Sequence, residues 1–402
     1  MRTTPLLPLL AFSLLLACKP SAEGSTTPST VVAPLHPDAI PFDDAHWEYE
    51  AREHEVTRHL GRPALRLHGG FALLRDVELA EGTIEFDMAF EPDTAFAGAA
   101  WHVQDTETFE RFYLRVFLSG SREATQYTPY FNGVSGWQLY HGPGYNAKVR
   151  FRGNTWVPIK IVISSGRAEV YVGGMARSGV EEPTMIEPTM AIPRLELGAT
   201  NGRVGLFVEP LPVSWGVTPI WFSNVRVTPS VAPPLRSPAP EDRSRPGRVP
   251  KWQVSEAFSE AKIATLRQLP ADEAAAHQWT PLPTEPEGLA NLARVQGAGK
   301  DRDTVFTRVT VISERAQTKR LDFGFSEKAR VYLGGRLLWS GDDTWSSRDI
   351  TFQGVVGYWD SVYLPLVEGP NELWFAVTEN IDMHGGWGVL AAFEDLDGIR
   401  FP

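Results

Sequence analysis

The chain has 402 residues, which is enough for two domains of ordinary size. Its formal net charge is −11 and it contains no run of basic residues, which argues against binding to nucleic acid or to lipid through a polybasic segment. With 35 glycines, 32 prolines and 11% aromatic residues, the composition favours many short strands joined by turns. We therefore expect an all-β protein.

Residues 1–18 have the pattern of a secretion signal. Arg2 precedes an apolar run, Pro5 to Leu16, that is too short to span a bilayer. The run ends in LLAC at residues 15–18, which resembles a bacterial lipobox, and Cys18 is the only cysteine. The resemblance implies lipid on the Cys18 sulfur and, because Lys19 rather than Asp follows, an outer-membrane lipoprotein held in the membrane by this lipid only. An ordinary signal peptide with a chance cysteine is the alternative.

Residues 19–40 are rich in Ser, Thr and Pro and predict a flexible tether. Residues 41–229 predict a first domain of short strands separated by Gly-containing turns, with almost no helical periodicity. Two antiparallel sheets packed face to face explain this pattern best. With Cys18 used for lipid no disulfide is possible, so the core alone must stabilise the fold.

Period-two alternation divides the strands of this domain into an apolar face and a polar face. Within residues 109–117 the polar face carries a phenol and guanidinium groups, and residues 82–90 and 99–104 show the same parity. If these strands are neighbours, one face of one sheet collects Glu85, Asp87, His102, Tyr113 and Arg115.

The following segment adds aromatic and amide side chains at a density that usually indicates a partner. These residues are Gln126, Tyr127, Tyr130, Trp137, Gln138 and Tyr140. The alternative is the solvated outer face of an ordinary sandwich, since antiparallel sheets often have one polar side. The predicted carbohydrate-binding residues are Glu85, Asp87, His102, Tyr113, Arg115, Gln126, Tyr127, Trp137 and Tyr140.

Several segments of the first domain resemble concanavalin-like (laminin-G-type) jelly rolls, and they are most similar to bacterial secreted domains of the 3-keto-disaccharide hydrolase type. They include EGTIEFD at 81–87, FYLR at 112–115, WQLY at 137–140, NTWVPIK at 154–160 and WFSNVRV at 221–227. The resemblance spans nearly all of residues 41–229. It implies a sandwich with a concave sheet that accepts carbohydrate.

Glycosidase activity would require further carboxylates. Retaining glycosidases of the laminarinase type carry alternating acids on one strand, with nucleophile and acid about 5 Å apart. Glu85 and Asp87 match the first two positions of that pattern, but the third acid is missing. It could come from Glu91 through a bulge, or from Glu110 or Glu123 on another strand. The candidate catalytic residues are Glu85, Asp87 and His102, the last as a base.

Residues 230–250 are crowded with proline and charge and predict a stiff linker. A minor helix is expected near 255–269, where Ser255 can cap a sparse apolar side. Residues 251–402 predict a second β-sandwich. In it, ARVYLGG at 329–335 and LPLVEGPNEL at 364–373 resemble the galactose-binding-like jelly rolls that accompany many β-galactosidase-type enzymes. In that superfamily such modules are often only structural.

Loops of the second domain are rich in Trp and acidic residues, and loop tips are the usual ligand position. The candidate binding residues are Trp345, Trp359, Asp360, His384 and Trp387. The favoured alternative is that Trp359 and Trp387 close the end of the sandwich as core residues. Asp342 and Asp343 could hold a structural Ca²⁺. No other cofactor or metal is expected, because no ligand spacing, P-loop or dinucleotide motif occurs.

The sequence thus predicts two β-sandwich (jelly-roll) domains that bind poly- or oligosaccharide through the concave sheet of the first. Two other classes stay open. One is a glycoside or 3-keto-disaccharide hydrolase that uses Glu85 or Asp87, and the other is a surface scaffold whose aromatic patches bind proteins.

Overall fold

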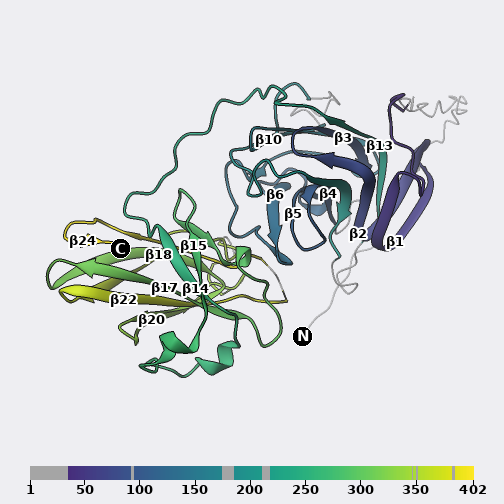
Figure 1. Ribbon diagram of the computed structural model, residues 1–402. Coiled ribbons are helices and arrows are strands. Elements are labelled where there is room, and N and C mark those ends of the chain that lie inside the picture. The colour runs from purple at the N-terminus through teal and green to yellow at the C-terminus, as the bar shows by residue number, and fades with distance from the viewer. Residues whose placement is uncertain are drawn as a thin grey trace, which may run out of the picture. The chain divides into compact units, whose positions relative to one another are not determined.

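The computed structural model describes residues 35–91, 95–173, 185–210, 218–345, 347–349, 352–382 and 385–402. Residues 35–402 form one compact unit built almost entirely from antiparallel strands (Figure 1), which confirms the predicted all-β class. Within the described ranges, no helix combines the length and the apolar character needed to cross a membrane. Cys18 and His384 lie outside the described residues.

The strands fall into two groups. The first group is β1 Trp47–His59, β2 Arg62–Leu79, β3 Gly82–Ala89, β4 Phe96–Val103, β5 Phe109–Arg115, β6 Thr125–Phe131, β7 Val134–Ser135, β8 Asn146–Ala147, β9 Val157–Ser164, β10 Arg167–Val172, β11 Met190–Ile192, β12 Gly202–Val208 and β13 Ile220–Pro229. The second group is β14 Lys251–Ser255, β15 Trp279–Pro283, β16 Leu289–Asn291, β17 Thr304–Ser313, β18 Gln317–Ser326, β19 Lys328–Leu333, β20 Arg336–Asp342, β21 Asp360–Leu366, β22 Gly369–Thr378, β23 Gly388–Phe393 and β24 Ile399–Arg400.

A bend in β2 turns the first group into two layers. Before the bend β2 pairs with β13 through residues 65–67, and after it β2 pairs with β12 through residues 70–79. Gly69 and Gly70 form the bend at φ values of 59° and 131°, which residues with a Cβ rarely adopt. Layer I continues from β13 through β3, β9, β10 and β11, and layer II from β12 through β4, β5, β6 and β7 (Figure 1).

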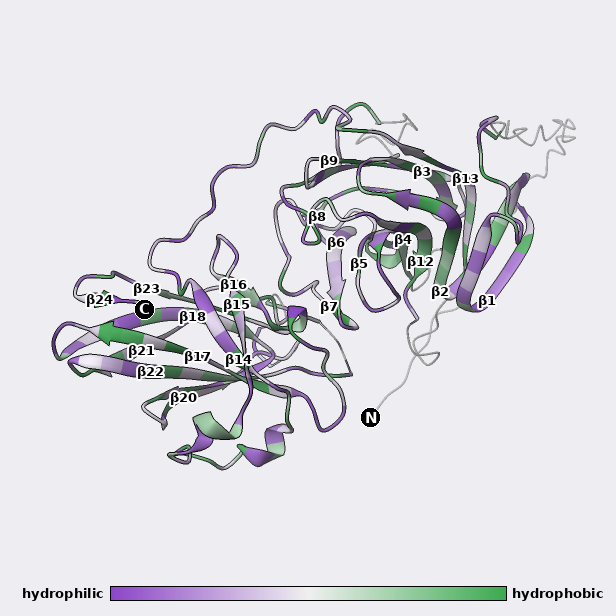
Figure 2. Cartoon of the chain, viewed as in Figure 1, coloured by the Kyte–Doolittle hydropathy of each residue, from purple (hydrophilic) through white to green (hydrophobic). Residues whose placement is uncertain are grey.

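The two layers enclose one apolar core. It receives Ile84, Phe86 and Met88 from β3 and Phe112 and Leu114 from β5, as the alternation predicted for each strand. Bands of both hydropathy colours run along these strands in Figure 2, because the intervening residues are polar and point outward. Each layer therefore has its own outward polar face.

The second group also forms a sandwich. One sheet has the order β15-β14-β17-β22-β19-β20, with β24 on β17, and the other has the order β16-β23-β18-β21. Side chains of both sheets, such as Phe375 of β22 and Phe323 of β18, share one core. The sequence-based expectation of a second β-sandwich thus agrees with the strand pairing.

The helix expected near 255–269 is reduced to a short 3-10 helix, η3 Glu260–Lys262. Ser255 is the last residue of strand β14 and does not cap a helix. Phe258 makes backbone hydrogen bonds with Thr304, and its ring packs with Phe306 in a small cluster. Tertiary contacts have therefore overridden a weak helical pattern. The other 3-10 helices in the described ranges are η1 Val116–Leu118, η4 Glu273–Ala276 and η5 Leu292–Arg294.

Candidate functional site

The predicted single polar face does not exist, because its members lie on opposite layers. Glu85 and Asp87 point outward from β3 in layer I, whereas Tyr113 and Arg115 point outward from β5 in layer II. Four strands, β13, β2, β12 and β4, lie between β3 and β5 in the sheet order. Alternation correctly gives the face of each strand, but it carries no information about which layer the strand joins.

His102 is turned into the interior by a β-bulge. The pairing of β4 with β12 contains one extra residue between Ala100 and Val103, and His102 has a φ of 51°. Its Nδ1 lies 2.7 Å from Oε2 of Glu110, which is fully buried. The same carboxylate accepts hydrogen bonds from Nε1 of Trp101 and the hydroxyl of Tyr127. His102 and Tyr127 therefore belong to a closed core network, not to a binding face.

Tyr140 is also buried. Its hydroxyl donates to Glu285 at 2.6 Å, and Glu285 is ion-paired with Arg194 and Arg294. Glu285 belongs to the loop between β15 and β16, so Tyr140 joins the two groups of strands within the compact unit. Its predicted role in binding carbohydrate is therefore replaced by a structural contact.

The remaining predicted residues of layer II, Tyr113, Arg115, Gln126 and Trp137, do converge. Glu123, His141 and Asn146, which were not predicted to bind sugar, join them, and we call the whole set the Arg115 cluster. The Arg115 guanidinium donates to Gln126 Oε1 at 3.0 Å and lies 5.8 Å from the Trp137 ring. Asn146 donates to both Gln126 and Glu123, and His141 lies 3.1 Å from Glu123. Tyr113 and Gln126 are fully buried, and burial raises the pKa of Tyr113. This network is closed by its own members.

A different arrangement surrounds Asp87 on layer I, where His59, Arg62, Asp87, Trp156, Trp221 and Asn224 form what we call the Asp87 cluster. The Arg62 guanidinium contacts the Asp87 carboxylate at 2.5 Å and lies 5.4 Å from the Trp156 ring. Asn224 donates to the same carboxylate at 3.2 Å. His59 stacks on Trp221 at 4.0 Å, and its edge faces Trp156 at 5.9 Å. Both Trp rings and His59 are half-buried.

Three nitrogens of the Asp87 cluster are buried and have no hydrogen-bond partner among the described residues. They are Nε2 of His59, Nε of Arg62 and Nε1 of Trp156. A buried N–H without a partner costs about 1–3 kcal/mol, so Nε of Arg62 and Nε1 of Trp156 gain from an acceptor supplied by water or ligand. Nε2 of the neutral His59 is a donor or an acceptor according to its tautomer. Burial lowers the pKa of His59, which favours its neutral form. By contrast, the indole N–H of Trp101 has a partner, because it donates a hydrogen bond to Glu110.

Glu85 adjoins this cluster but has a partner of its own. Its carboxylate lies 2.9 Å from the Arg226 guanidinium, and its side chain is partly exposed. Burial raises the pKa of Asp87, and the nearby Arg62 opposes this only in part. The two carboxylates thus have different environments on one outward face, with their Cα atoms about 7 Å apart by strand geometry.

The second-domain candidates do not gather into one site. Trp387 is in the core and donates to the Val377 carbonyl, as the structural alternative predicted. Trp359 is 52% exposed and Trp345 42% exposed, so the core role favoured for Trp359 is wrong. Asp360 is ion-paired with Arg348.

The acid pair considered for Ca²⁺ is engaged with neighbours. Asp342 accepts from Thr344, and Asp343 is ion-paired with Arg348 at 3.0 Å. Within the described ranges, no group of three or more His, Cys, Asp or Glu side chains is placed to hold a metal ion.

Sequence reasoning missed most of the Asp87 cluster, namely His59, Arg62, Trp156, Trp221 and Asn224. A signal was available for Trp156, because the alternation of Val157 and Ile159 into the core places it on the outward face. His59 and Arg62 flank a hairpin turn, where no pattern distinguishes a binding residue from a solvated one.

Comparison with known proteins gives only remote likenesses. No family model and no curated protein matches the sequence. Among solved structures, the carbohydrate-binding module CBM66 from Bacillus subtilis is 13% identical, with 44% of this chain and 91% of that chain covered and a TM-score of 0.31. A xylan β-1,4-xylosidase from Bacillus halodurans is 15% identical, with coverages of 48% and 38% and a TM-score of 0.29. The GH43 protein BlXynB from Bacillus licheniformis is 13% identical, with coverages of 47% and 35% and a TM-score of 0.29. At such scores these likenesses carry no argument about function.

Proposed function

We propose that the protein binds poly- or oligosaccharide through the Asp87 cluster on the outward face of layer I. The observation that carries this proposal is the group of buried nitrogens without partners on His59, Arg62 and Trp156. They lie beside an acceptor, the Asp87 carboxylate, and beside half-buried indole rings. This site replaces the concave sheet expected from the sequence, because the Arg115 cluster uses its own polar groups.

Carbohydrate fits these groups by its chemistry. Sugar hydroxyls accept hydrogen bonds from N–H donors and donate to carboxylates, so one ring can satisfy the indole N–H and Asp87 together. The C–H faces of a pyranose or furanose ring are apolar and pack on indole rings. The −11 net charge of the chain disfavours polyanions, so neutral or basic glycans are the expected class.

The test is calorimetric titration of the full-length chain with glucans, galactans and peptidoglycan fragments. We expect one or more of these to bind, and Asp87→Asn to weaken that binding by about tenfold or more. Glu53→Gln is the matched control, since Glu53 is an exposed acid on strand β1. No heat with any ligand from a folded protein, or equal binding by the Asp87→Asn variant, would contradict the proposal.

Hydrolysis is the second candidate function, and the placement of Asp87 and Glu85 favours it. Glycosidases use a pair of acids, and these two carboxylates, bound to Arg62 and Arg226, lie two residues apart on one outward face. An assay with nitrophenyl and 3-keto glycosides separates hydrolysis from binding. Turnover that is lost in both Glu85→Gln and Asp87→Asn would establish an enzyme, and binding without turnover would exclude it.

The lipobox-like sequence at Cys18 leads to a further part of the proposal, that lipid on this residue anchors the protein in the outer membrane. Expression of wild type and Cys18→Ser in a Gram-negative host, followed by detergent phase partitioning, tests this. We expect the wild type in the detergent phase with outer-membrane markers and the variant in the aqueous phase. Wild type in the aqueous phase would contradict the anchor.

A further inference from the structure

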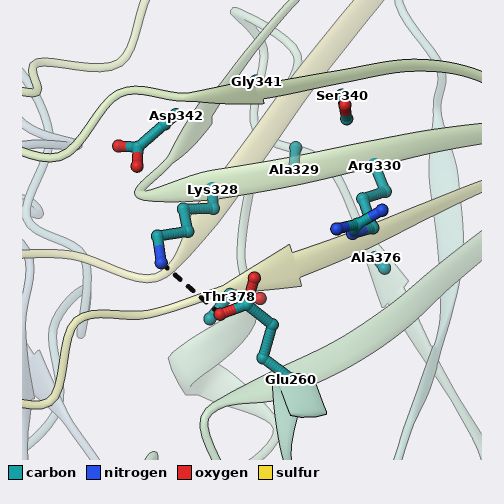
Figure 3. A pocket seen from close by; sticks show the side chains of 9 residues that line it. All are labelled: Glu260, Lys328, Ala329, Arg330, Ser340, Gly341, Asp342, Ala376 and Thr378. Carbon is teal, nitrogen blue, oxygen red and sulfur yellow. Dashed lines mark hydrogen bonds and ion pairs between the residues drawn. The ribbon is translucent and has the colours of Figure 1, made fainter. Parts of the chain in front are cut away.

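Two adjoining pockets open on the second sandwich, independently of the Asp87 cluster. They have volumes of about 340 and 250 Å³ and share Glu260, Lys328 and Thr378. Figure 3 shows the first pocket, in which Lys328 of β19 extends toward Glu260 of η3 and Thr378 of β22. The Lys328 ammonium lies 3.4 Å from the Glu260 carboxylate, so its charge already has a partner.

Two buried carboxyl groups line the second pocket. Glu327 is 1% exposed and Glu379 is 2% exposed. Neither oxygen of Glu327 and only one oxygen of Glu379 has a hydrogen bond of normal geometry in the described part of the chain. Oε1 of Glu379 faces the Gly386 N–H at 3.5 Å. Three carboxyl oxygens of one pocket therefore have no donor in good hydrogen-bond geometry among the described residues, although the Gln138 and Asn380 amides lie near Glu327.

The charge balance of this pocket is negative when its carboxyl groups are ionised. Its lining carries the carboxyl groups of Glu260, Asp303, Glu327 and Glu379 against one ammonium, that of Lys328. Burial, together with the acids nearby, raises the pKa of Glu327 to about 7 and that of Glu379 well above its usual range. No cation is among the groups that shift these two pKa values most.

We propose that this pocket binds a primary ammonium group. An R–NH₃⁺ group brings three N–H donors and one positive charge, which match the three oxygens and the excess negative charge. A neutral hydroxyl would supply donors but no charge. A divalent ion would need more ligands than this pair provides, since no group of three or more suitable side chains occurs among the described residues.

The test compares ammonium probes with their neutral counterparts on the full-length chain at pH 8. Ethanolamine is compared with ethylene glycol, and glucosamine with glucose. Whichever of ethanolamine and glucosamine binds more tightly shows whether the ligand is a small amine or an amino sugar. We expect an ammonium probe to bind about tenfold or more tightly than its neutral counterpart. Glu379→Gln should remove this preference. If the Glu379→Gln variant does not fold, Glu327→Gln is tested in its place. Glu241→Gln, an exposed acid in the linker, should keep the preference.

Three results would overturn the inference. The first is equal binding of ammonium and neutral probes to the wild type. The second is an ammonium preference that survives in both Glu379→Gln and Glu327→Gln. The third is saturable Ca²⁺ binding that these variants abolish while ethanolamine and glucosamine have no effect, which would make the pocket a metal site.

Discussion

The two outward faces of the first sandwich carry similar residues but differ in how their polar groups are satisfied. On layer II, Arg115 reaches Tyr113, Glu123 and Gln126, and the amide of Asn146 completes the network. On layer I, Asp87 has partners in Arg62 and Asn224, but the neighbouring His59 and Trp156 keep nitrogens without partners. Polar and aromatic content alone therefore does not distinguish a binding face from a structural one. Unpartnered groups distinguish the two clusters, although Arg111 Nε and Ser135 Oγ elsewhere in layer II and Trp252 Nε1 in the second core also lack partners in the described part of the chain.

The largest expected effect concerns the closed network of layer II. Arg115→Ala removes one of the donors to the Glu123 carboxylate and to the buried Gln126 amide, and it breaks a nearly buried charge pair. We expect the free energy of unfolding to fall by about 3 kcal/mol, measured by urea unfolding, with sugar affinity unchanged. If the free energy of unfolding fell by less than about 1 kcal/mol and sugar binding were lost, layer II would be the binding face and layer I the structural one.

Glu327 extends the comparison to acids without partners. Its folded pKa of about 7 lies above the unfolded value of about 4.5, so the folded state binds the proton more tightly and stability falls as pH rises between these values. We expect Glu327→Gln to remove this penalty and raise the free energy of unfolding by about 2–3 kcal/mol at pH 8, with little change at pH 4.5.

The control for this pH dependence is Glu241→Gln, whose side chain is exposed. It should change the free energy of unfolding by less than about 0.5 kcal/mol at both pH values. If Glu327→Gln proved equally neutral at pH 8, Glu327 would have a partner that supplies charge or donors in solution.

The smallest expected effects come from two Trp variants, which separate a loss of sugar affinity from a loss of stability. Trp156→Phe keeps a ring and removes the unpartnered N–H, so sugar affinity should fall by about tenfold, with a small change in stability. Trp101→Phe removes the N–H that reaches Glu110, so stability should fall while sugar affinity stays unchanged. Calorimetry and urea unfolding of both variants measure this, and affinity losses of equal size in the two would remove the distinction.

The fold was largely predictable because alternation is local. The strand around Phe112 and the strand around Phe86 both place their apolar residues in the core as expected. Long-range choices were not predictable. No local sequence pattern indicates that β3 belongs to layer I and β5 to layer II. This difference in layer separates Glu85 from Tyr113.

The site was less predictable because small irregularities decide it. A single extra residue in β4 turns His102 inward, and its sequence does not reveal the bulge. The unpaired N–H of Trp156 depends on what lies around it in space, which no sequence pattern encodes. Residue type therefore indicated the chemistry, and only the three-dimensional contacts located it.

The most direct test follows the indole N–H resonances of Trp156 and Trp101 by heteronuclear NMR while a bound glycan is added. We expect the Trp156 resonance to shift as its N–H gains an acceptor, while the resonance of Trp101, whose N–H already donates to Glu110, stays in place. A glycan that binds without moving the Trp156 resonance, and instead shifts that of Trp137 in the Arg115 cluster, would contradict it.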